Sequence, residues 1–240
     1  MNFLFRLLCL AGLLLSPSLI RADGVGELEE LRSRLNADWL LVRNDQAHRI
    51  RTYARLEDGK RYRSFKVEAT LDTPVEPLAR VLLDFSGYPR WFWKTREAGL
   101  IRQDSPTDYY VYMVHDAPYG LPDRDTILHA TVEPQTKGHP YVLLRTTAAP
   151  DLKPPRPPLV RILAEEMTIR LTPLPGNKVQ IVVEGYFDPG GQVPVWAANM
   201  VQRNAPYAVM LAMQQMTELP EYRNNTKPLP FAVYNADNLP

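Results

Sequence analysis

Hydrophobic and polar residues alternate along the middle of the chain. In the segment 63–72, Phe65, Val67, Ala69 and Leu71 alternate with polar residues, and this period of two predicts a strand with one buried face. Similar runs follow at the spacing of an antiparallel sheet, separated by residues that favour turns. They cover residues 98–103, 109–115, 126–132, 141–147, 160–171 and 178–187, and two shorter strands are expected around Asn44 and Asp45.

Three segments have patterns typical of helices instead. Leucines recur every three or four residues between 26 and 36, with charged residues among them, which predicts an amphipathic helix. A second helix is expected to begin with Thr73 as its N-cap, Pro74 at the first helical position and Glu76 in the first turn. The third is a long, mostly apolar run that ends at Pro220.

The order of these elements predicts the fold class. A helix and strands come first, then a helix, a long antiparallel series of strands and a long C-terminal helix. The proline-rich segment 149–159 is expected to be a loop, and residues 220–240 lack periodicity and are interpreted as a tail. An antiparallel sheet has one face to cover, and a curved sheet can wrap around a helix. The sequence therefore predicts an α+β fold.

A glycine turn, Asp188-Pro189-Gly190-Gly191, joins the last predicted strand to the last helix. It is either a phosphate-binding loop or a sharp joint. A phosphate-binding loop would need a Gly-Lys-Ser/Thr or G-x-G-x-x-G pattern, whereas Gln192-Val193-Pro194 follows here. Paired glycines allow a tight reversal, and proline fixes the entry into a helix. We therefore interpret the turn as a joint.

The same segment carries a family resemblance. "YFDPGGQVPVWAAN" (186–199), together with Arg124-Asp125, resembles the START family of lipid-transfer domains, and its glycine turn is similar to that of phosphatidylcholine-transfer members. The match is specific over 188–199, moderate over 109–126, and elsewhere rests on element order. The resemblance implies a START-like domain at 23–219 with a helix-grip fold, in which a curved antiparallel sheet wraps around a long C-terminal helix and encloses a lipid cavity.

The first 22 residues are expected to be a secretory signal peptide. Arg6 precedes an apolar run over residues 7–15, and Ala22 offers a small residue at the cleavage site. The apolar run is shorter than the ~20 residues of a membrane span, although an uncleaved anchor is the alternative. Cleavage predicts a periplasmic or secreted protein.

Composition changes this picture little. The chain has 240 residues, of which 45% are hydrophobic and 23% charged, as expected for one globular domain. Removing residues 1–22 deletes two of the 28 basic residues, which leaves 26 against 27 acidic ones, and also deletes the only cysteine, Cys9. A net charge near −1 argues against nucleic-acid binding, and a chain without cysteine has no disulfide or thiolate chemistry.

Motifs of catalysis or metal binding are missing from the sequence. There is no G-x-S-x-G or H-E-x-x-H, and the four histidines are scattered. We therefore expect no metal, no cofactor, no catalytic residues and no enzymatic activity. The alternative is a cyclase- or hydrolase-like enzyme that uses a Tyr or Glu in the same cavity as acid or base.

The resemblance predicts which residues line the cavity. Strand parity puts Arg124, Thr126 and Leu128 on one face, which the resemblance suggests is the cavity face. Arg124 then either meets a lipid phosphate or forms a salt bridge with Asp116 or Asp123. The expected lipid-binding residues are Val111, Met113, Arg124, Thr126, Leu128, Tyr186, Trp196, Met200, Tyr207, Met210 and Leu211.

Other charged and aromatic residues are assigned less specific roles. Asp125 is expected to cap loop amides. Four charged residues lie within strand runs and are expected to face solvent, and these are Arg145, Arg161, Glu166 and Glu184. The alternative for each is an inward charge that is paired or meets a polar head group. Trp91 and Trp93 either anchor the second helix or touch a bilayer interface.

The expected ligand is a phospholipid held under the C-terminal helix. In phosphatidylcholine-binding relatives aromatic residues cage the choline, but this chain has Val111 and Leu128 at two of those positions, so Tyr186 and Tyr207 are candidate replacements. The remaining expectations are a glycerophospholipid such as phosphatidylcholine, transient membrane contact and a monomeric protein.

Overall fold

The structure is a computed structural model that describes residues 38–118 and 120–240. The signal peptide predicted at residues 1–22 and the helix predicted at 26–36 lie outside the described residues.

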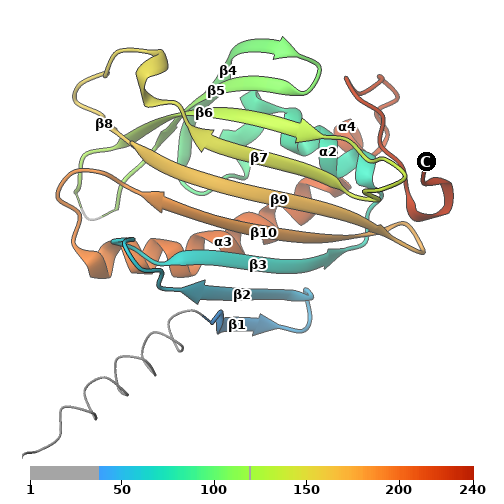
Figure 1. Cartoon of the computed structure of the whole chain (residues 1–240), viewed down its shortest axis with the longest axis horizontal. Coiled ribbons are helices and arrows are strands. Elements are labelled where there is room, and N and C mark those ends of the chain that lie inside the picture. Colours follow the sequence, from blue (N-terminus) through green and yellow to red (C-terminus); the bar gives the residue numbers. More distant parts are fainter. Residues whose placement is uncertain (1–37, 119) are drawn as a thin grey trace, which may run out of the picture. The chain divides into compact units, whose positions relative to one another are not determined.

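Ten strands of the described chain form one sheet (Figure 1), in the order β1-β2-β3-β10-β9-β7-β6-β5-β4 with β8 paired to β6. Only the β6–β8 pair is parallel among these strands, and the others are antiparallel. The strands are β1 (Leu40–Asp45), β2 (Ile50–Arg55), β3 (Ser64–Leu71), β4 (Thr95–Ser105), β5 (Asp108–His115), β6 (Arg124–Glu133), β7 (Val142–Ala148), β8 (Val160–Arg161), β9 (Ala164–Leu174) and β10 (Lys178–Asp188).

Helices cover one face of this sheet. The long helix α3 packs on β2 and β3 and against α2, and it runs behind the sheet in Figure 1. The other helices are short, and the described set is α2 (Val75–Leu83), α3 (Val195–Glu218), α4 (Pro220–Arg223), η1 (Phe85–Arg90), η2 (Pro150–Leu152) and η3 (Ala236–Asn238). A large antiparallel sheet with a long C-terminal helix confirms the predicted α+β helix-grip fold.

The hydrophobic core lies between the sheet, α2 and α3. Val67, Ala69 and Leu71 of β3 are buried, as their alternation predicts, and they join Leu78 of α2 and Met213 of α3 in one cluster. Burial of such side chains is the main favourable contribution to folding, at about 1.5–3 kcal/mol for each large one.

The glycine turn is a joint, as predicted. Gly190 and Gly191 have φ values of 68° and 60°, a left-handed backbone conformation that residues with a Cβ adopt only with strain. Pro194, with φ −58° and ψ 135°, then occupies the N-cap position of α3.

The predicted start of the second helix is wrong by one position. Pro74, with φ −61° and ψ 165°, is the N-cap residue and α2 begins at Val75. No side chain of the N-cap residue caps the helix. Instead, the amide of Val75 donates a 3.1 Å hydrogen bond to Oδ1 of Asn235. A residue 160 positions away therefore supplies the cap that the sequence assigns to Thr73.

The strand predicted over 160–171 is two strands. β8 pairs in parallel with β6, and β9 begins at Ala164. At the break, the guanidinium of Arg161 forms hydrogen bonds with the carboxylate of Asp125 on β6. The backbone amide of Ile162 donates to the carbonyl of Asp125 at 2.8 Å, so this segment is held to β6 rather than continuing into β9.

The last residues, 220–240, pack on the core although their sequence has no hydrophobic periodicity. Phe231 and Val233 contact the core cluster. Tyr234 and Gln135 exchange two hydrogen bonds, of 2.7 and 2.9 Å.

Candidate functional site

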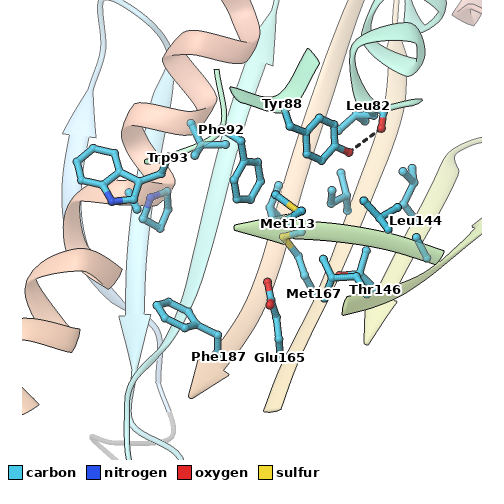
Figure 2. Close-up of a pocket in the computed structure, with 18 of the residues that line it drawn as sticks. Leu82, Tyr88, Phe92, Trp93, Met113, Leu144, Thr146, Glu165, Met167 and Phe187 are labelled. Carbon is cyan, nitrogen blue, oxygen red and sulfur yellow. Dashed lines mark hydrogen bonds between the residues drawn. The ribbon is translucent and has the colours of Figure 1, made fainter. Parts of the chain in front are cut away.

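A cavity of about 180 Å³ lies between the sheet and α3. Its walls come from the strands β3, β5, β6, β7, β9 and β10 and from α2, η1 and α3, and they are mostly apolar and aromatic. Figure 2 shows Tyr88, Phe92 and Trp93 along one wall, with Met113, Leu144 and Met167 across from them. The hydroxyl of Tyr88 donates to the carbonyl of Leu82 at 2.7 Å, so this ring presents no free donor to the cavity.

Five of the expected lipid-binding residues line this cavity, and they are Val111, Met113, Leu128, Tyr186 and Met210. Val111 and Leu128 face each other across β5 and β6. Trp91 is also part of the wall. It is 5% exposed and packs edge-on against Tyr88 with ring centroids 4.9 Å apart. The core interpretation of Trp91 is therefore correct.

Four expected residues on α3 do not line the cavity: Trp196, Met200, Tyr207 and Leu211. The lining of α3 comes instead from Val201, Gln202, Ala205, Pro206, Val209, Met210 and Met213. At ~100° per residue, the predicted face is turned from the observed one by roughly 140° around the helix axis. Trp196 is 61% exposed, and Tyr207 donates a 2.6 Å hydrogen bond to Asp45 of the β1–β2 hairpin.

A second, smaller cavity of about 90 Å³ lies under the start of α3. It holds Arg124 and is bordered by Val193 and Ala197. Five side chains form a wall that both cavities share, and they are Trp93, His115, Ile162, Phe187 and Val201. The two cavities therefore adjoin at these five residues.

Arg124 is a buried cation, 7% exposed. Its Nε donates to the carbonyl of Pro189 at 3.3 Å and its Nη1 donates to the carbonyl of Pro122. Burial lowers its pKa. Within residues 38–118 and 120–240 it has no salt bridge, because Asp116 and Asp123 bind Arg96 instead, at 3.2 and 2.6 Å. The salt-bridge alternative is therefore wrong.

Asp125 forms a buried ion pair rather than a cap for loop amides. Both of its oxygens accept hydrogen bonds from Arg161, at 3.0 and 2.8 Å, and this pairing raises the pKa of the guanidinium. Arg161 also donates to the carbonyls of Pro150 and Lys153, at 2.7 and 3.0 Å. The pair fastens the proline-rich loop to β6, so the expectation that Arg161 faces solvent is wrong.

Glu165 is the site residue that sequence reasoning missed. Figure 2 shows its carboxyl pointing into the cavity beside Phe187 and Met167. Its Oε2 accepts a 3.0 Å hydrogen bond from the hydroxyl of Thr126. Burial raises the pKa of Glu165 to about 7, although this hydrogen bond acts in the opposite direction. Glu166, which the sequence singles out, pairs instead with Lys60 at 2.7 Å.

His115 lies in the wall between the two cavities. Its Nδ1 is 3.1 Å from the hydroxyl of Thr95. Burial lowers the pKa of His115 to about 4, so its ring is neutral at physiological pH. Burial therefore favours the uncharged form of two titratable side chains of opposite type around the cavity.

The described residues contain no group of three or more His, Cys, Asp or Glu side chains placed to hold a metal ion. Among the helices of residues 38–118 and 120–240, none combines the length and apolar character needed to cross a membrane.

The START domain family model matches residues 25–216. The chain belongs to the START domain family. An uncharacterized protein of Pseudomonas aeruginosa is 22% identical over 184 residues, which cover 77% of this chain and 89% of that protein.

Solved START structures have the same fold. A STAR-related lipid transfer protein from Xanthomonas axonopodis superposes with a TM-score of 0.69 at 25% identity, over 75% of this chain and 99% of that one. Human STARD10 gives a TM-score of 0.66 at 23% identity, over 83% and 82% of the two chains. Family membership and fold together support lipid binding.

Proposed function

We propose that this START domain is a lipid carrier, which withdraws a glycerophospholipid such as phosphatidylcholine from a membrane and carries it through water without altering it. The observation that carries the proposal is the apolar cavity enclosed between the sheet and α3. Burying methylene groups gains ~0.8 kcal/mol each, so an acyl chain of ~15 methylenes gains about 12 kcal/mol. Only an enclosed cavity recovers most of that free energy.

The cavity must grow to hold such a ligand. Its 180 Å³ is close to the ~150 Å³ of an engineered cavity that admits benzene, and below the ~300–1,000 Å³ of pockets for larger ligands. Two features support growth. The smaller cavity adjoins it at the five residues of the shared wall, and Pro206 within α3 removes a helical hydrogen bond where the helix borders the cavity.

Arg124 supports a phosphate-bearing head group. Among the described residues, this buried guanidinium donates only to backbone carbonyls and has no hydrogen-bonded counter-ion. A phosphate would supply one through short, charge-assisted hydrogen bonds. The head group would then occupy the smaller cavity and the chains the larger one.

Exposed apolar side chains near the smaller cavity suit transient contact with a membrane. Val195 and Trp196 at the start of α3 are 49% and 61% exposed, and Leu163 is 66% exposed. Leu163 follows Ile162, which lines the smaller cavity together with Val193 and Ala197. Tryptophan is favoured at bilayer interfaces. In this proposal the protein is a monomer that acts in the periplasm or after secretion, in keeping with the signal pattern of residues 1–22.

Ligand occupancy tests the proposal. The protein purified under non-denaturing conditions should retain phospholipid, which native mass spectrometry and lipid extraction would identify. Met210→Trp should reduce the occupancy severalfold, since Met210 is 1% exposed and lines the cavity. Gln215→Trp adds similar bulk on the exposed face of the same helix and should retain the lipid. Absence of bound lipid from the wild type, or equal occupancy in both variants, would contradict the proposal.

One observation favours an enzyme as the second candidate. A carboxyl with a pKa of about 7 in a cavity, as for Glu165, is suited to general acid–base catalysis. A cyclase-like activity on a hydrophobic substrate would then be abolished in Glu165→Gln. A carrier would release its ligand chemically unchanged in both forms.

A further inference from the structure

Glu165, hydrogen-bonded to Thr126 behind it, places a carboxyl at one end of a mostly apolar cavity. Glu165 lies on β9 opposite Phe187 of β10, and Phe187 belongs to the wall shared with the Arg124 cavity. The pair is therefore at the end of the larger cavity that adjoins the smaller one. A carboxyl placed among apolar groups without a further partner is unfavourable, so a ligand that completes its hydrogen bonding is a natural occupant.

One carboxyl oxygen is left for a ligand. Oε2 accepts from Thr126, whereas Oε1 has no hydrogen-bond partner among the described residues. Glu165 keeps some accessible surface and lines the cavity. The carboxyl can thus reach a ligand inside the cavity.

The charged and titratable groups on the surrounding elements do not neutralise Glu165. On β5, His115 is held neutral by burial, which lowers its pKa. On β6, Arg124 binds backbone carbonyls in the smaller cavity. Glu166 of β9 and Arg161 of β8 are turned to Lys60 and Asp125. On β10, the Tyr186 ring lies under Lys60, and the cavity-lining part of α3 offers only the amide of Gln202.

Glu165 is therefore mostly protonated below neutral pH, because burial raises its pKa to about 7. A protonated carboxyl donates one hydrogen bond, which a carboxylate cannot do. Thr126 occupies an oxygen as donor, so the remaining O–H calls for an acceptor on the ligand.

The distance between Thr126 and Arg124 indicates which acceptor this is. The two residues lie on the same face of β6, two positions apart, which is about 7 Å along a strand. The glycerol carbons of a phospholipid span a similar distance between the phosphate and the acyl ester. A phosphate at Arg124 would therefore bring an ester carbonyl to the Thr126–Glu165 pair.

We infer that Glu165, oriented by Thr126, donates a hydrogen bond to the acyl ester carbonyl of the bound glycerophospholipid and selects ester-linked over ether-linked chains. This inference rests on the proposed function, and it goes beyond it by naming the linkage that the site recognises. An ether oxygen is a weaker acceptor and lies outside the position of the carbonyl.

A competition between two matched lipids tests the inference. Vesicles would carry equal amounts of diacyl and dialkyl phosphatidylcholine with the same chain lengths, and the lipid taken up by the full chain would be measured by mass spectrometry. At pH 6 the wild type should prefer the diacyl lipid by roughly three- to tenfold, the range of one net hydrogen bond. At pH 9 the preference should be lost, because the ionised carboxyl cannot donate.

Two variants separate this role from simple packing. Glu165→Gln keeps an N–H donor and should retain the preference at both pH values. Glu165→Met keeps the volume, removes the donor and should take up both lipids equally at both pH values. A preference that persists in Glu165→Met, or a wild type that takes up both lipids equally at pH 6, would overturn the inference and leave the proposed function standing. A wild type that takes up neither lipid would overturn both.

Discussion

Glu165 and His115 face the same cavity, and burial shifts their pKa values in opposite directions. For Glu165 the pKa rises from 4.5 to about 7, so the folded protein holds a proton that the unfolded chain has lost. Its contribution to stability therefore decreases as the pH rises from about 4.5 to 7. For His115 the pKa falls from 6.5 to about 4, so its contribution increases as the pH rises over about 4 to 6.5. In the wild type the two effects largely cancel.

Replacing either side chain should expose the pH dependence of stability that the other one contributes. In His115→Asn the free energy of unfolding should fall by about 2 kcal/mol between pH 5 and pH 7 relative to the wild-type profile, and in Glu165→Gln it should rise by about 2 kcal/mol. Denaturant unfolding at steps of pH would measure both profiles. Because every other group is unchanged, profiles parallel to the wild type would show that neither side chain is desolvated.

At the scale of single residues, the sequence does indicate that Glu165 points inward. Glu165 has the same strand parity as Met167, Ile169 and Leu171, whose apolar alternation marks the inner face. It was missed because acidic residues are expected outside unless paired. The Asp125–Arg161 pair could not be found in this way, since it depends on a parallel pairing of β6 with β8 that no local pattern encodes.

At the scale of elements, α3 is held at its middle by the β1–β2 hairpin. The hydroxyl of Tyr207 donates to Asp45 at 2.6 Å, and the guanidinium of Arg43 lies 3.4 Å from the centre of the Tyr207 ring. The Tyr207 hydrogen bond is the main cause of a pKa of Asp45 far below its ordinary value. This contact adjoins Pro206, where α3 borders the cavity, so it restrains the segment that moves for lipid entry in the proposed function.

Tyr207→Phe should therefore speed lipid transfer. The substitution removes one hydroxyl and keeps the ring, so α3 should open more readily and transfer of a fluorescent phospholipid between vesicles should become severalfold faster. Tyr53→Phe is the matched control, because the Tyr53 hydroxyl donates to Glu68 at 3.0 Å within the sheet. If Tyr207→Phe transfers lipid at the wild-type rate, the hairpin contact does not limit opening.

The bounds of elements were predictable where the signals are local. The glycine turn and Pro220 delimit α3 at Val195–Glu218, close to the predicted run. The direction in which α3 faces was not predictable, because both the cavity face and the neighbouring face carry apolar residues. The start of α2 was misplaced because Asn235 replaces the local cap, and tertiary partners of this kind leave no trace in the helix sequence.

At the scale of the whole described chain, the C-terminal segment joins regions that are distant in sequence. It supplies the cap of α2 through Asn235, pairs with Gln135 through Tyr234, and places the hydroxyl of Tyr222 2.6 Å from Asp84. These contacts involve single side chains rather than a repeated face, which explains why the segment shows no period. None of its residues lines the cavity, so its role is to stabilise the fold around the site.

Truncation after Leu229 should separate stability from ligand binding. It removes Phe231 and Val233 from the core cluster and leaves the amide of Val75 and the buried side chain of Gln135 without their partners. Each unsatisfied group costs about 1–3 kcal/mol, so the free energy of unfolding should fall by about 3–5 kcal/mol, roughly 6–20 °C in Tm for a domain of this size. Thermal unfolding would measure the loss, and native mass spectrometry well below the new Tm should still find the lipid bound.

Asn235→Ala, which removes only the cap, should lose about 1 kcal/mol. An unchanged Tm would show that the segment does not stabilise the domain, and loss of lipid from the folded truncated protein would show that the segment belongs to the binding site.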